Sequence, residues 1–203
     1  MSMRACLPLL AMIWVGSVAL ASDEPPTRLR VEIDGTSHVL AAGATHSVVV
    51  DGRTLRLRVE ELPWRQFHEG NLRFDYPRHM GWEFDASPPR SWVLDGNDAV
   101  LSVFDNAGQA ATPAQAASEL ARHFRMPEAG TTPARLRTAK TGTLRGVAIT
   151  IKLATTALGY EYYAVGKDDA AWLLVLQGTL DDHGAHSAEF RAMRERLADT
   201  LEF

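Results

Sequence analysis

The sequence predicts an α+β protein, in which two main helices pack on an antiparallel β-sheet preceded by a small N-terminal β-meander. Segments of alternating apolar and polar residues recur along most of the chain, and several are joined by Asp-Gly turns. Two stretches, 113–125 and 187–200, carry apolar residues at helical spacing. Because successive strands follow one another through short turns, antiparallel pairing is favoured over the parallel sheet of a dinucleotide-binding domain.

The first 21 residues are predicted to be a cleavable signal peptide. A short basic start at 1–4 precedes an apolar run at 7–20 and the small-residue cleavage signal Ala19-Leu20-Ala21. The apolar run is shorter than the roughly 20 residues that a membrane-spanning helix needs. We therefore expect an exported protein, periplasmic or secreted, that is cut after Ala21 and is not inserted in a membrane after cleavage.

Charge and cysteine content exclude several classes of function. The 203-residue chain has a formal net charge of −4 and scattered basic residues, so it lacks the basic patch typical of nucleic-acid-binding proteins. Its single cysteine, Cys6, lies in the predicted signal peptide, which would leave the mature chain without a disulfide or a thiol nucleophile. A cysteine-free exported protein depends on its core for stability, which favours a Gram-negative periplasm over an animal extracellular space.

Residues 22–62 are predicted to form two β-hairpins that together make a four-stranded meander. The segment 31–40 resembles the segment 48–57, because each alternates apolar and polar residues around a central Asp-Gly pair. Asp-Gly suits the positive φ values of a type I′ turn, so each segment predicts a hairpin. A sheet this small cannot close its own core, and we expect it to pack on the rest of the protein.

Residues 63–203 are predicted to form the main α+β domain, with 63–70 as a connector. Its strand candidates are 71–77, 82–84, 92–94, 99–104, 147–154, 160–165 and 172–176. The last of these is apolar on both faces, which indicates a central strand that is covered on both sides. The helix at 113–125 has Thr112 as its N-cap, Pro113 at its first position and Gln115 to complete a capping box.

The order of these elements resembles the PsbP-like superfamily over residues 71–203. The resemblance rests on the strand end Phe74-x-Tyr76-Pro77, on Trp82 and the hairpin after it, on the helix at 113–125, on Leu144-Arg145-Gly146 and on the closing Leu201-Glu202-Phe203. That superfamily includes photosystem extrinsic subunits, a nuclear-transport factor and periplasmic proteins. The resemblance implies a protein that binds other proteins or assists assemblies, and it implies no catalytic residues.

His183, His186 and Glu189 are the metal-ligand candidates of this chain. Imidazole and carboxylate groups so close together are ligand types that zinc, copper or nickel accept. Gly184 interrupts the helical spacing, however, and Ser187 suits the N-cap of the following helix. The alternative is therefore a polar loop in which Glu189 lies favourably against a helix N-terminus.

The aromatic residues Trp64, Phe67, Trp82 and Trp92 lie between the two predicted modules in the sequence. They suit a seam that joins the meander to the main domain. Alternatively, some of them are exposed and form a ligand cleft or a surface for a partner.

The sequence contains no nucleophile elbow, phosphate-binding loop or zinc-protease helix motif. We therefore expect a non-catalytic exported binding or accessory protein that acts through protein–protein interaction, without a cofactor. Its partner would be another envelope or periplasmic protein. Two alternatives remain: a periplasmic immunity or inhibitor protein that neutralises a toxin or hydrolase, and a metal-dependent hydrolase that uses the His183/His186 region.

Overall fold

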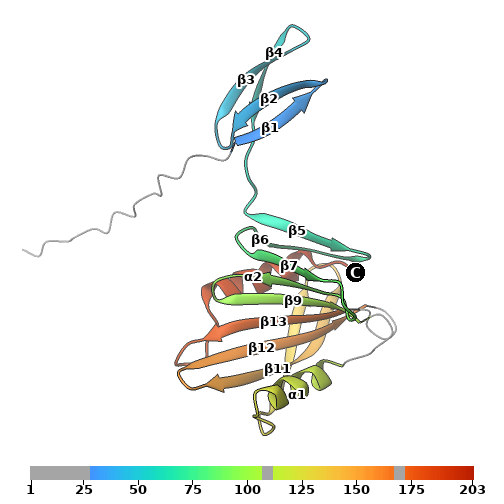
Figure 1. The fold of residues 1–203 in the computed structure, drawn as a ribbon, viewed down its shortest axis with the longest axis vertical. Helices are drawn as coiled ribbons and strands as arrows, with labels where there is room; N and C mark the ends of the chain where they lie inside the picture. The colour runs from blue at the N-terminus through green and yellow to red at the C-terminus, as the bar shows by residue number, and fades with distance from the viewer. Residues whose placement is uncertain (1–27, 107–111, 167–171) are drawn as a thin grey trace, which may run out of the picture. The chain divides into compact units, whose positions relative to one another are not determined.

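The chain divides into two compact units, Met1–Glu61 and Leu62–Phe203, in the computed structural model of the protein (Figure 1). The structure describes residues 28–106, 112–166 and 172–203. The predicted signal peptide and its cleavage site lie outside these residues, so export stays a prediction.

The N-terminal unit consists of two β-hairpins. Its strands are β1 (Arg28–Ile33), β2 (Thr36–Ala41), β3 (Thr45–Val50) and β4 (Arg53–Arg58). Asp34 and Gly35 have φ values of 47° and 75°, and Asp51 and Gly52 have values of 49° and 71°. The two Asp-Gly turns therefore have the positive φ values that were predicted.

The predicted four-stranded meander is wrong, because β1–β2 and β3–β4 form separate two-stranded sheets. The imidazole of His46 connects the two hairpins at the end of β2. Its Nε2 lies 3.1 Å from the backbone nitrogen of Ala41 and 3.0 Å from the carbonyl oxygen of that residue. Because Nε2 carries either a proton or a lone pair, the side chain bonds to one of these two backbone groups at the end of β2.

The C-terminal unit is built on a seven-stranded antiparallel sheet in the order β10-β11-β12-β13-β9-β8-β7 (Figure 1). A separate hairpin, β5–β6, precedes it in the chain. The strands are β5 (Trp64–Glu69), β6 (Leu72–Pro77), β7 (Gly81–Asp85), β8 (Ser91–Asp95), β9 (Ala99–Asp105), β10 (Thr131–Thr138), β11 (Gly142–Leu153), β12 (Thr156–Val165) and β13 (Trp172–Leu180).

The predicted α+β class is wrong, because the protein is mostly β. About 57% of the described residues lie in strands and 14% in helices. Three strands account for much of the difference. β5 was expected to be a connector, β10 was not predicted, and β11 extends over 12 residues. Pairing with a neighbouring strand stabilises extended backbone that single-sequence patterns underestimate.

The two helices occupy the positions that the sequence predicted. In α1 (Pro113–His123), the Thr112 hydroxyl accepts a hydrogen bond from the backbone N–H of Gln115, and the Gln115 side chain accepts one from the backbone N–H of Thr112. In α2 (Ala188–Thr200), the Ser187 hydroxyl caps the N-terminus by accepting from Phe190. Neither of these described helices has the length and apolarity needed to cross a membrane.

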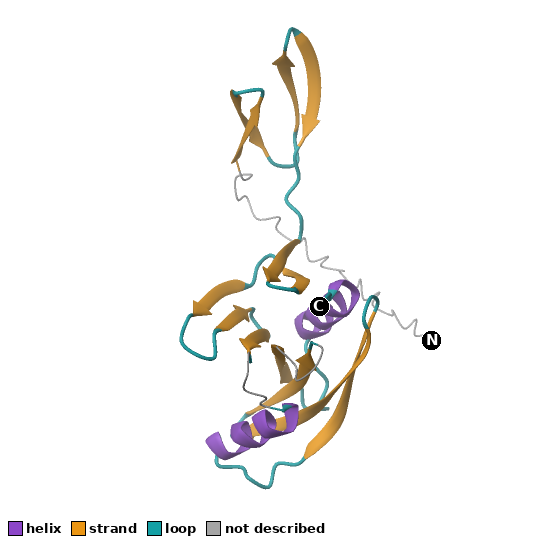
Figure 2. Ribbon diagram, turned by 90° about the vertical axis from the view of Figure 1, so that its right-hand side faces the viewer, coloured by secondary structure: helices purple, strands orange, loops and turns teal. Residues whose placement is uncertain are grey.

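The central strand β13 separates two apolar cores, as its two-sided apolar pattern predicted. Leu174 and Leu176 are fully buried with residues of α2 and the β5–β6 hairpin. The intervening Leu173 and Val175 pack with residues of α1, β11 and β12. The two helices therefore lie against opposite faces of the sheet, and Figure 2 shows them well separated with strands between them.

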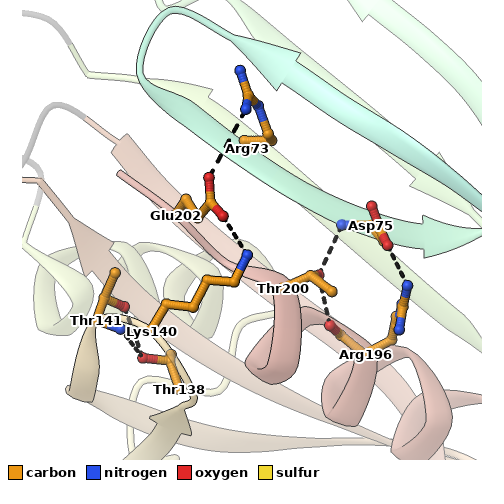
Figure 3. Close-up of polar contacts among 8 residues, drawn as sticks. All are labelled: Arg73, Asp75, Thr138, Lys140, Thr141, Arg196, Thr200 and Glu202. Atoms are coloured by element: carbon orange, nitrogen blue, oxygen red, sulfur yellow. Dashed lines mark hydrogen bonds and ion pairs between the residues drawn. The ribbon is translucent and has the colours of Figure 1, made fainter.

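The C-terminal end connects α2 to the β5–β6 hairpin and to the turn that follows β10 (Figure 3). Arg73 and Glu202 exchange two backbone hydrogen bonds of 2.9 and 2.8 Å. The Glu202 carboxylate also bonds to Lys140, and the Arg196 guanidinium bonds to Asp75. These contacts hold the hairpin over one face of the sheet.

Two glycines that face each other in the sheet leave room for the start of α2. Gly159 on β12 is paired with Gly178 on β13. The stacked rings of His186 and Phe190, with centroids 3.7 Å apart, lie against this pair. A Cβ atom at Gly178 would lie 2.5 Å from Phe190 Cδ2, and one at Gly159 would lie 2.6 Å from His186 Cε1. The missing side chains thus let the start of α2 approach the strands.

Gly178→Ala is expected to lower the free energy of unfolding by about 1–3 kcal/mol, because the new methyl group overlaps the Phe190 ring. Urea denaturation at neutral pH measures this change. Gly130→Ala is the matched control, since nothing lies within 4 Å of a Cβ atom there. Equal stability of the Gly178→Ala and Gly130→Ala proteins would contradict the close approach of α2.

Candidate interaction surface

The edge strand β7 carries the most exposed aromatic side chains of the C-terminal unit. Among the described residues, β7 pairs with β8 alone, and all five of its residues are exposed. Trp82 is 45% exposed and Phe84 is 51% exposed. These two side chains and the unpaired edge of β7 are called the β7 surface below.

The register of the sheet places Trp82 and Phe84 on the same face. Trp82 lies opposite Leu94 and Phe84 lies opposite Trp92, and both partners are buried in the core. The Trp82 ring packs 5.7 Å from that of Phe67, and the Phe84 ring packs 5.2 Å from that of Trp92. Core aromatics therefore support one side of each ring, and much of the remainder faces solvent.

The structure corrects the predicted aromatic surface for two of its members. Phe67 is fully buried, stacked on Phe74 with ring centroids 4.7 Å apart, and Trp92 is only 3% exposed. Both became core residues because residues 64–69 form a strand of a hairpin instead of a connector. Trp64 is half-buried, with the Arg196 guanidinium 5.1 Å above its ring.

Trp82 is thus the one of the four predicted aromatics that is strongly exposed, and Phe84 is the residue that sequence reasoning missed. The spacing in the sequence could have identified Phe84. Trp82 and Phe84 are separated by one residue, so they share a face of any strand that contains both.

Arg90 fixes the chain at the entry to β8, next to the β7 surface. Its guanidinium bonds to Asp105, lies 3.2 Å from a Glu69 carboxylate oxygen and stands 5.3 Å above the Trp92 ring. The hydrogen bond that Arg90 donates to the Asp105 carboxylate is the main reason that the pKa of Arg90 is raised. The charge beside the surface is therefore compensated within the protein.

The metal-ligand candidates His183, His186 and Glu189 have separate surroundings. His183 is exposed, and its backbone N–H donates to the Asp181 carboxylate at 2.9 Å. The His186 ring is stacked on Phe190, and burial lowers its pKa. Among the residues that the structure describes, no group of three or more His, Cys, Asp or Glu side chains is placed to hold a metal ion.

Glu189 binds the loop between β8 and β9 rather than the two imidazoles. Its carboxylate accepts backbone hydrogen bonds from Asn97 at 3.2 Å and from Asp98 at 2.5 Å, and it also bonds to His79 Nε2. A Cβ atom on Gly96 would lie 2.6 Å from Glu189 Oε1, so the glycine permits this approach. The carboxylate near the start of α2 therefore has a structural role in joining the helix to the sheet.

The hydrogen bonds of Glu189 change its acidity. Burial is the largest single influence and favours the neutral acid, but the donors from Asp98, His79 and Asn97 together outweigh it. They hold the pKa of Glu189 below its ordinary value of 4.5. The ionised form is thus stabilised in the folded protein.

No protein-family model matches this chain, and no curated protein matches it. The resemblance of residues 71–203 to the PsbP-like superfamily stays a prediction.

Glu189→Gln is expected to lower the free energy of unfolding by about 1–2 kcal/mol at pH 7, because the amide replaces a charged acceptor of several N–H groups. A depressed carboxyl pKa contributes stability above the unfolded-state pKa, and this stability is lost as the pH falls through the folded-state pKa. The difference between the two proteins should therefore shrink below pH 4.5.

Urea denaturation between pH 7 and the lowest pH at which both proteins stay folded measures this trend. Glu195→Gln, on an exposed position of the same helix, is the control and should change stability little. If the stability difference between Glu189→Gln and the wild-type protein did not change with pH, it would contradict stabilisation by the ionised Glu189 carboxylate.

His186→Ala is expected to cost about 1–3 kcal/mol of folding free energy, because it removes a ring packed on Phe190 and on the paired glycines. His183→Ala should change stability by less than about 0.5 kcal/mol, since its side chain is exposed. Thermal unfolding with and without added zinc measures both effects. A metal-induced stabilisation that both variants abolish would contradict this separation of roles.

Proposed function

We propose that the protein is an exported, non-catalytic binding protein that engages another envelope or periplasmic protein through the β7 surface. The observation that carries this proposal is the exposure of Trp82 and Phe84 side by side on β7, whose outer edge pairs with no strand among the described residues. Export rests on the order of basic, apolar and small residues in the first 21 positions.

An edge strand offers unpaired backbone groups, to which an extended segment of another protein can add as a further strand. Trp side chains are also enriched among the residues that contribute most to binding energy. A segment paired with β7 would place every second side chain beside Trp82 and Phe84. The partner is thus expected to offer an extended segment with apolar residues at alternate positions.

The other edge strand of the sheet, β10, is less suited to bind a partner than β7. β10 carries Pro133, which has no N–H to donate, and its Arg135 and Arg137 side chains are exposed. Proline and charged side chains are the features by which proteins protect sheet edges from unwanted pairing. β7 also carries two charged residues, Glu83 and Asp85, but the residues that alternate with them, Trp82 and Phe84, are exposed. On β10, the residues that alternate with the arginines are buried.

Phe84→Lys is expected to lower recovery of the partner at least about tenfold, because a charge replaces half-exposed apolar surface at the contact. The tagged, exported chain is captured from its native envelope, and bound proteins are quantified by mass spectrometry. Leu153→Lys is the matched control, since Leu153 is 38% exposed on β11, away from β7. Thermal unfolding verifies that both variants are folded.

The identity of the recovered partner separates two roles. An envelope assembly indicates an accessory protein, and a toxin or hydrolase indicates an immunity or inhibitor protein. Failure to recover any partner near stoichiometry, or equal recovery by the Phe84→Lys and wild-type proteins, would contradict the proposal.

A further inference from the structure

A second feature, on the sheet face opposite the β7 surface, is a pocket of about 580 Å³ beside α1. Its floor is formed by β12, β13 and β9, and one wall is formed by Leu120 and His123 of α1. Trp82 and Phe84 share their face with the core that contains α2, whereas the pocket belongs to the α1 face. The two features are therefore independent.

The sheet register makes the pocket floor continuous. Tyr162 on β12 lies opposite Val175 on β13, and Val175 lies opposite Ser102 on β9. These three residues form one row across three strands and all line the pocket. α1 packs against β11 and β12, so the part of this row that lies on β13 and β9 extends beyond the strands that the helix covers.

Two tyrosine hydroxyl groups of the pocket lining have no hydrogen-bond partner among the described residues. Tyr160 is 6% exposed and Tyr162 is 4% exposed. Within the described part of the chain, neither hydroxyl has a hydrogen bond, and neither oxygen is among the buried unpartnered atoms, so both stay accessible to a molecule in the pocket. Burial raises the pKa of both phenols, so each stays protonated at neutral pH and can donate a hydrogen bond.

The rest of the lining is mostly apolar and has little charge. Phe104, Leu120, Leu173 and Val175 contribute apolar surface. The charged lining residue is Glu119 of α1, and no Lys or Arg occurs among the described lining residues. An anionic ligand would find no fixed positive charge here.

We propose that this pocket binds an uncharged, largely apolar small molecule that carries an oxygen acceptor. Ligand pockets generally enclose roughly 300–1,000 Å³ and combine apolar walls with a few polar groups, which this pocket does. The apolar body of the molecule packs on Phe104, Leu173 and Val175. Its oxygen accepts a hydrogen bond from Tyr160 or Tyr162.

The test uses Nile red, an uncharged aromatic dye with a carbonyl oxygen, titrated into the folded full chain and followed by fluorescence. We expect saturable binding at a single site. Ser102→Phe places a ring in the pocket and is expected to weaken binding at least about tenfold. Ser118→Phe is the matched control on an exposed position of α1, and it should leave the affinity within about twofold.

Tyr160→Phe and Tyr162→Phe test the hydroxyl groups without changing the shape of the pocket. Together they should weaken binding about fivefold or more, the effect of losing one hydrogen bond. Tyr163→Phe is their control, because its fully buried hydroxyl bonds to Glu161 and does not line the pocket. These variants keep the proposal testable if Ser102→Phe does not fold.

The proposal would be overturned by no saturable binding to the folded chain, by unchanged affinity in folded Ser102→Phe, or by unchanged affinity in the Tyr160→Phe/Tyr162→Phe protein. Phe84→Lys is expected to bind the dye normally. Loss of dye binding in that variant would place the dye at the β7 surface and would also overturn the proposal. Dye binding is measured without a partner protein, so these results do not depend on whether the proposed protein-binding function is right.

Discussion

The C-terminal unit depends on the burial of β13 from both faces. Leu174 and Leu176 contribute to the core beneath α2, and the alternate residues Leu173 and Val175 contribute to the core on the opposite face, which also contains α1. The strand is also hydrogen-bonded on both edges, to β12 and β9. Because burial of apolar surface is the main favourable contribution to folding, a single strand that serves two cores couples the helices to each other through the sheet.

The features proposed for binding arise where this packing ends. On one face, α2 and the β5–β6 hairpin cover the centre of the sheet, while Trp82 and Phe84 on the edge strand stay half-covered. On the other face, α1 packs on β11 and β12, and the pocket lies beside it. At both sites, apolar side chains continue the buried face of the sheet past the helix or hairpin that covers its centre. These side chains are therefore left partly open to a binding partner.

Local signals in the sequence predicted local structure well. The Asp34-Gly35 and Asp51-Gly52 turns and the Thr112 capping box were predicted because they involve neighbouring residues and backbone geometry alone. Contacts between residues that are far apart in the sequence could not be predicted from such local signals. Phe67 and Trp92 entered the core because a hairpin packed there, and Glu189 turned to the β8–β9 loop instead of to His183 and His186. Nothing in the spacing of those residues reports such contacts.

The sequence by itself determined where turns and helices begin and that β13 is covered on both sides, since these follow from φ preferences, capping and apolar periodicity. Only the tertiary structure decided the mostly β character, the separation of the N-terminal hairpins and the exposure of Phe84. The physical reason is that strand pairing and burial are set by partners far away in the chain. For example, the need for glycine at Gly159 and Gly178 becomes evident only from the aromatic rings that pack against them.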